Sequence, residues 1–162
     1  MVRKRLTWFR LCTDYHQFYL LDEGIKPPAP DDYNGPDVFV QRLLAKPHII
    51  ALMTFQPNTF SAAVEVLDGE PETDVAGWDH VVDASLEVPT GKLAVDTCCN
   101  GVAKRQRVAP GWYRVRVCAG GMAGWESVPE GQDPPERFRI SLWPAESAPV
   151  RVLKQWAGPV SV

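Results

Sequence analysis

The chain has 162 residues and a formal net charge of −3, and 45% of its residues are hydrophobic, including six Trp and six Phe. This apolar content excludes a disordered chain, and the length fits one domain that buries roughly 70% of its unfolded surface. We therefore predict a single domain over residues 1–162. The basic start is followed by Leu6–Leu11, which Arg10 interrupts, so no signal peptide or membrane span is expected and a cytoplasmic location is predicted.

Alternation of apolar and polar residues with period two is the main structural signal. This alternation, together with continuous apolar runs, predicts about nine strands. In chain order they are Thr7–Cys12, Tyr15–Leu21, His48–Phe55, Ala62–Leu67, Trp78–Val88, Lys92–Asp96, Trp112–Val117, Arg137–Leu142 and Val150–Lys154. In the fifth strand the even positions would face a core, whereas Asp79 and Asp83 would face water. The expected core includes Val82, Leu86, Val115, Val117, Ile140 and Leu142. An all-β fold, an antiparallel sandwich, is predicted.

The segment from Asp37 to Ala45 fits neither period well. A strand is favoured because Lys46-Pro47 then makes a turn into the strand that starts at His48, and a single short helix is the alternative. Two later connections, at Val88–Gly91 and Val108–Gly111, place Pro before Gly as tight turns do.

A metal centre is not predicted from the histidines and cysteines. His16, His48 and His80 could be combined with Cys98 and Cys99, but no local ligand pair of the Cys-x-x-Cys kind is present to form half of a zinc site. We expect core or strand-end histidines, reduced thiols, no metal and no cofactor.

Catalytic patterns are also missing from the sequence. No serine lies in a Gly-x-Ser-x-Gly turn, and Asp96 near Cys98 fits a strand that runs into a turn as well as it fits an activated thiol. Two carboxylates at glycosidase spacing would occur by chance among twenty acidic residues. We therefore predict no enzyme.

Acidic and basic residues are segregated along the chain. From Ser61 to Gly91 there are eight carboxylates and no Lys or Arg, whereas no acid occurs between Thr97 and Gly124. Crowded like charges cost stability, which favours a basic protein partner for the acidic part. The predicted partner-binding residues are Asp68, Glu70, Glu72, Asp74, Asp79, Asp83 and Glu87.

The basic residues from Lys104 to Arg116 are interpreted as a solvated strand face. They could contact phosphate, but a pI of about 5.6 and the acidic field oppose nucleic-acid binding, so no nucleic acid and no membrane partner are predicted. The alternative function is a small-ligand or carbohydrate-binding sandwich that uses an exposed Trp112 or Trp125, although packing is the simpler role for the tryptophans.

A family resemblance rests on four short stretches. Tyr15-His16-Gln17-Phe18, the run from Val38 to Phe55, Pro110-Gly111-Trp112-Tyr113-Arg114-Val115 and Leu142-Trp143-Pro144-Ala145 resemble the competence protein J family of DNA-entry nuclease inhibitors and related uncharacterised bacterial proteins. The likeness runs over most of residues 12–145. It implies a cytoplasmic protein that silences a nuclease by covering its active site, as an immunity protein does. The sequence therefore predicts a non-enzymatic inhibitor of a bacterial nuclease or toxin.

Overall fold

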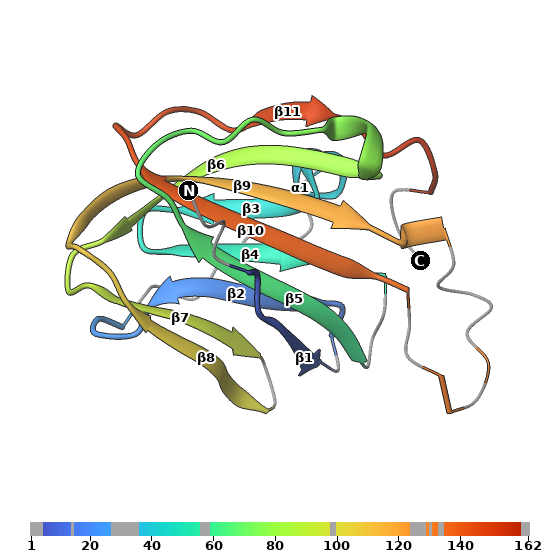
Figure 1. The fold of residues 1–162 in the computed structure, drawn as a ribbon, viewed down its shortest axis with the longest axis horizontal. Helices are drawn as coiled ribbons and strands as arrows, with labels where there is room; N and C mark the ends of the chain where they lie inside the picture. Colours follow the sequence, from blue (N-terminus) through green and yellow to red (C-terminus); the bar gives the residue numbers. More distant parts are fainter. Residues whose placement is uncertain are drawn as a thin grey trace.

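Two β-sheets face each other in the computed structural model of the chain (Figure 1). The structure describes residues 5–13, 15–26, 36–55, 59–97, 100–123, 129, 131–132 and 135–159. Among these residues no helix is long and apolar enough to cross a membrane.

The larger sheet has six strands in the order β1-β5-β10-β9-β6-β11. Their bounds are Trp8–Cys12, Thr59–Val66, Arg137–Pro144, Gly111–Gly120, His80–Val88 and Arg151–Lys154. The smaller sheet has the order β3-β4-β2-β7-β8. Its strands are Leu43–Lys46, Ile49–Met53, Gln17–Asp22, Lys92–Thr97 and Gly101–Arg107. The neighbouring strands run antiparallel, except that β10 lies parallel to β5.

The core lies between the two sheets and confirms the all-β sandwich. Phe18 from the smaller sheet meets Phe60 and Phe138 from the larger one, with ring centroids 4.9 and 5.1 Å apart. The residues predicted to be core, Val82, Leu86, Val115, Val117, Ile140 and Leu142, are all buried. Alternation therefore identified the inner face of the larger sheet correctly.

The outer face of the larger sheet differs from the prediction. The odd positions of β6 were expected in water, but Val81, Asp83 and Ser85 are buried. The connection from β5 to β6, residues 67–79, crosses this face and runs beside β11 along the top of Figure 1. It carries the short 3-10 helix η1, Val75–Gly77. Strand parity indicates which residues share a face but not whether a loop covers that face.

The segment from Asp37 to Ala45 forms a helix and then a strand. Helix α1 spans Pro36–Gln41, with Pro and Asp in its first turn, where a fixed φ and a negative charge favour a helix start. Arg42 has a φ of 59° and ends the helix, after which β3 begins. The strand favoured from the sequence is correct only for the second half, and the short helix holds for the first.

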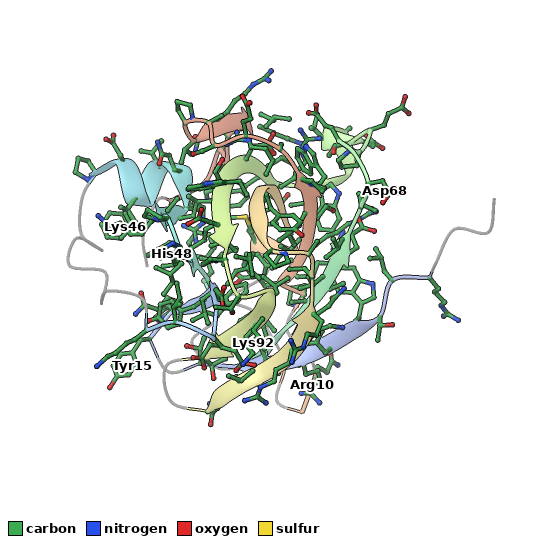
Figure 2. All side chains as sticks on the ribbon, turned by 90° about the vertical axis from the view of Figure 1, so that its left-hand side faces the viewer. Arg10, Tyr15, Lys46, His48, Asp68 and Lys92 are labelled. Carbon is green, nitrogen blue, oxygen red and sulfur yellow. The ribbon has the colours of Figure 1, made fainter. Side chains whose placement is uncertain are left out.

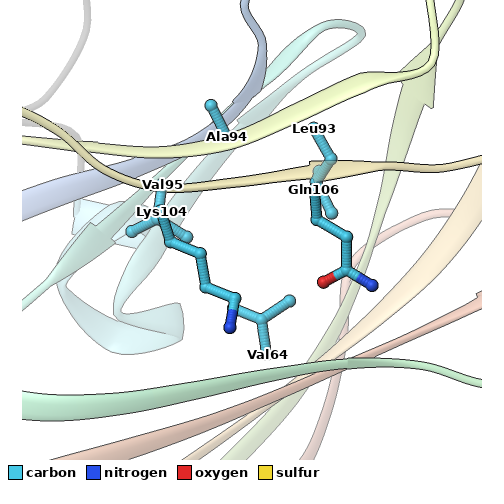
Figure 3. A pocket seen from close by; sticks show the side chains of 6 residues that line it. All are labelled: Val64, Leu93, Ala94, Val95, Lys104 and Gln106. Atoms are coloured by element: carbon cyan, nitrogen blue, oxygen red, sulfur yellow. The ribbon is translucent and has the colours of Figure 1, made fainter. Parts of the chain in front are cut away.

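Strand β8 was not predicted, because its inward positions are polar. Lys104 and Gln106 point between the sheets towards Val64 of β5 (Figure 3). The ammonium of Lys104 lies 5.2 Å from the ring centroid of Phe9 in β1. Inward-pointing charges on an edge strand discourage pairing with another chain. These two side chains therefore close the side of the sandwich between β8 and β1.

One predicted tight turn depends on a glycine. Gly91 has a φ of 71°, and a Cβ there would lie 2.5 Å from the carbonyl oxygen of Val108. Glycine therefore suits this position of the Val88–Gly91 turn, because it adopts the positive φ and leaves room for the carbonyl oxygen of Val108.

Of the cysteines, Cys12 is an exposed and Cys118 a buried free thiol, and Cys98 and Cys99 lie outside the described residues. Burial raises the pKa of Cys118 to about 11. In the part of the chain that is described, no three His, Cys, Asp or Glu side chains are grouped as metal ligands.

The core predicts a clear contrast between two aliphatic substitutions. Ile140→Ala should lower the free energy of unfolding by about 2 to 5 kcal/mol, because Ile140 is fully buried and its removal leaves a cavity. Val40→Ala, on the exposed side of α1, should change it by less than about 0.5 kcal/mol. Denaturant unfolding of both variants checks this, and equal losses would contradict the assignment of the core.

Candidate partner-binding surface

Four of the seven predicted partner-binding carboxylates are neighbours in one stretch. Asp68, Glu70, Glu72 and Asp74 are exposed and lie in residues 68–74, which we call the acidic segment. From Glu70 to Asp74 exposure alternates, since Pro71 and Thr73 are half-buried between the exposed acids, whereas Asp68 and Gly69 form a bend. Residues 70–74 thus turn one edge towards the sheet and their carboxylates towards solvent.

The other three predicted carboxylates lie outside the acidic segment and have structural partners of their own. Asp79 is half-buried and accepts a hydrogen bond of 2.9 Å from the backbone N–H of Met122. Glu87 lies 2.8 Å from Nε2 of His48, at the other end of β6. Glu87 comes eight positions after Asp79, the residue before β6, so the two residues are about 26 Å apart. They do not form one surface.

Asp83 is not on the surface at all, which corrects its predicted position. It is only 4% exposed, and its two carboxylate oxygens accept hydrogen bonds of 2.8 Å from Nε and Nη2 of Arg116. Arg116 is itself 3% exposed, although the sequence placed it on a solvated basic strand. The two residues are directly paired across β6 and β9. They form a bidentate ion pair on the covered face of the larger sheet.

Arg116 also holds the acidic segment. Its Nη1 donates to the carbonyl oxygen of Pro71 at 3.0 Å and to Oγ1 of Thr73 at 2.8 Å, and its Nη2 donates to Glu70 at 2.8 Å. With the two bonds to Asp83, all five N–H groups of the guanidinium are used. We call this arrangement the Arg116 clamp.

The electrostatics of the clamp follow from these contacts. The hydrogen bonds that Arg116 donates to Asp83 raise the pKa of Arg116 above its ordinary value, against the cost of desolvation, and Glu70 adds to the rise. The guanidinium carbon lies 5.2 Å from the ring centroid of Trp143, a cation–π contact. Glu70 keeps 61% of its side chain exposed. The clamp therefore fixes the segment without neutralising Asp68, Glu72 or Asp74.

A second connection covers the same face. Arg114 donates from Nη1 to Ser85 at 2.9 Å and to the carbonyl oxygen of Ala148 at 2.8 Å, and from Nη2 to that of Pro149 at 3.2 Å. Arg114 and Arg116 are thus bound to the covered face of the larger sheet. The basic stretch seen in the sequence is divided between two sheets, with Lys104, Arg105 and Arg107 on β8.

Between the two connections lies an open cleft of about 510 Å³. Its lining includes Trp143, Glu70, Glu146, Arg114 and Arg151. Opposite charges are therefore mixed in it, and no single ligand charge is favoured.

The tryptophans give no exposed sugar-binding platform in the region described. Trp112 is half-buried, Trp143 is buried and Trp78 lies under Arg137, whose guanidinium carbon is 4.9 Å from the ring centroid. Trp125 lies outside the described residues. Trp8 is 42% exposed, at the edge strand β1.

Part of the exposed basic charge lies apart from the acidic segment. Figure 2 shows Asp68 in the upper part of the molecule and Lys92 and Arg10 at its lower end. Lys92 is the register partner of Arg107, and both are exposed. The charge segregation of the sequence therefore holds only in part in the fold, because Arg116 lies directly beneath the acidic segment and pairs with Glu70. What the sequence did not indicate is the support under the acids, because Arg116 looked like a solvent-facing residue.

No protein-family model and no curated protein matches this chain. Its fold is similar to the crystal structure of ComJ, inhibitor of the DNA degrading activity of NucA, from Bacillus subtilis, with a TM-score of 0.67 and 12% identity over 88% of this chain and 100% of ComJ. A structure described as Crocagin biosynthetic gene J is similar with a TM-score of 0.59 and 16% identity, over 88% of this chain and 98% of that one. The resemblance to the competence protein J family is confirmed for the fold.

The Arg116 clamp predicts that removing only the charge of Arg116 lowers stability more than removing the charges of both Arg116 and Asp83. Arg116→Met should cost about 3 to 5 kcal/mol of unfolding free energy, because Asp83 is left buried without a counter-charge. The double variant Asp83→Leu with Arg116→Met should recover a large part of that loss. Denaturant unfolding measures both variants, with Arg151→Met as an exposed control. A double variant as unstable as the single one would argue against the buried pair as the cause.

Proposed function

We propose that this protein is a non-enzymatic inhibitor that binds a nuclease through the acidic segment. The observation that carries the proposal is the Arg116 clamp, which holds exposed carboxylates at fixed positions on a fold similar to that of ComJ. ComJ is described as an inhibitor of the DNA-degrading activity of NucA.

The chemistry of a nuclease explains why such a surface suits it. A nuclease groove must attract the phosphates of nucleic acid, so it presents basic side chains or metal ions. Asp68, Glu72 and Asp74 carry negative charge without a Lys or Arg in the stretch from Ser61 to Gly91. A fixed row of carboxylates can occupy the groove in place of phosphates, and it loses little conformational entropy on binding.

The support of the segment favours this use over a merely solvated loop. Five hydrogen bonds from one buried guanidinium position residues 70–73 and a strand beneath them. The partner in the proposal is a basic groove of a bacterial nuclease or toxin in the cytoplasm. Neither nucleic acid nor membrane is needed as a ligand.

The proposed contact surface contains fewer residues than the surface predicted from the sequence. Asp83 is buried and Glu87 pairs with His48, so neither is included. The proposed contact residues are Asp68, Glu70, Glu72 and Asp74, with Asp79 at the end of the same connection.

Charge reversal on the acidic segment should slow association. With the nuclease that co-purifies from the source cells, Asp68→Lys combined with Glu72→Lys should lower the association rate constant by about tenfold and weaken its salt dependence, because exposed charges steer encounter. Stopped-flow association over a salt series, together with residual nuclease activity, measures this.

Asp37→Lys is the matched control, since Asp37 is an exposed carboxylate on α1. It should leave the rate constant nearly unchanged. If the double reversal and the control bind at the same rate and with the same salt dependence, the acidic segment is not the contact surface.

A further inference from the structure

His80 connects two segments that are far apart in the sequence. It is the first residue of β6 and is 1% exposed. Its Nε2 lies 2.9 Å from the carbonyl oxygen of Gln41, the last residue of α1, and its Nδ1 lies 3.0 Å from the backbone nitrogen of Trp156. Both ring nitrogens are therefore used, one by each segment.

These partners determine the protonation state of the ring. A carbonyl oxygen only accepts and a backbone N–H only donates, so Nε2 carries the hydrogen and Nδ1 is the bare acceptor. The ring is neutral in this arrangement. A second proton on Nδ1 would place a donor against the N–H of Trp156 and remove that hydrogen bond.

We propose that His80 is a pH-sensitive latch that holds the C-terminal segment, residues 151–156, against the larger sheet and opens in mildly acidic solution. The latch is independent of the proposed function, since it involves none of the acids in the acidic segment.

The C-terminal segment is also held by a short strand pairing, by hydrogen bonds and by Val152 and Trp156, which pack against the core. Strand β11 has four residues and pairs with β6 in a register that shifts between Val152 and Lys154. Gln155 donates to the carbonyl oxygen of Val40 at 2.9 Å, and the ring of Trp156 lies 5.9 Å from that of Phe55. Loss of the central hydrogen bond would thus weaken a short edge strand, and not the sheet interior.

Opening of the C-terminal segment would also affect the connection from β5 to β6, which carries the acidic segment. Lys154 of β11 donates from Nζ to the carbonyl oxygen of Val75 in η1 at 3.1 Å. Opening of residues 151–156 removes this hydrogen bond. A loosened η1 would change how the neighbouring acidic segment binds a partner. This consequence for binding rests on the proposed function, whereas the latch itself does not.

The charged groups around His80 are of both signs, and Arg42 is the one that opposes its protonation. Arg42 follows α1, Lys154 lies in β11 and Asp79 precedes His80, whereas the neighbour across β9 is the uncharged Ala119. Burial and the charge of Arg42 lower the pKa of His80, although the bond to Gln41 raises it. Glu136 in turn offsets the charge of Arg42, whose pKa burial lowers to about 10.

The sign of the pH dependence follows from that lowered pKa. When residues 151–156 move away, the ring of His80 regains water and its pKa rises towards the ordinary value of 6.5, whereas the closed latch holds the pKa lower. The stabilisation is therefore complete above pH 6.5 and is lost as the pH falls towards the pKa of the closed state. In that window the equilibrium constant for opening rises by up to about tenfold for each unit that the pH falls.

Two measurements on the whole protein test the latch. An NMR titration of the wild-type ring nitrogens should place the pKa of His80 below 6.5, and hydrogen exchange corrected for its intrinsic pH dependence should show faster opening of residues 151–156 at pH 5.5 than at pH 7.5. In His80→Gln, whose neutral amide has a donor and an acceptor but does not titrate, the two pH values should give the same opening.

His48→Gln is the matched control, because His48 pairs with Glu87 away from this segment, and it should keep the wild-type response. The titration needs only the wild-type protein, so it decides the matter even if His80→Gln fails to fold. A pKa of His80 at or above 6.5, equal acid responses of wild type and His80→Gln, or acid opening that spreads equally through β2 and β10 would each overturn the proposal.

Discussion

A buried guanidinium is the constraint on which the outer layer of this protein depends. Desolvation of a charged group costs several kcal/mol unless its hydrogen-bonding groups are satisfied. Arg116 meets that requirement with Asp83 in the sheet and with the acidic segment above it, while Trp143 flanks the charge. The sheet, the connection and the guanidinium therefore stabilise one another, and the position of the acidic segment is set by the need to satisfy a buried charge.

The same requirement explains why the larger sheet has two long connections on its outer face. Ser85 and Arg114 are polar residues on strands, and their partners are the backbone atoms of Ala148 and Pro149. Such hydrogen bonds contribute about 1 kcal/mol each when made, and an unpaired buried donor costs more than that. The outer face is thus held by polar contacts with specific geometry, in contrast to the apolar contacts of the inner face.

The sequence predicted the features that depend on alternation within one strand. It missed the features that depend on segments distant in the sequence, such as a loop that covers a sheet face. Ile140 and its inward neighbours were identified because period two is a property of a single strand. Asp83 was misplaced because its burial comes from a connection that no pattern in β6 reveals. Strand β8 was missed because Lys104 points inwards at an edge, where protection against pairing overrides the apolar pattern. Of the candidate site, the acidic segment was read from composition, whereas its support by Arg116 required the fold.

The parallel pairing of β10 with β5 affects how the chain reaches its native state during synthesis. β10 lies between β5 and β9, so the centre of the larger sheet stays open until residues 137–144 have left the ribosome. Until then β5 and β9 present unpaired edges and apolar faces, which are prone to aggregate. Most of the contacts of this fold are long-range, which favours slow folding. Until β10 is in place, these strands are the part of the nascent chain that a chaperone would have to cover.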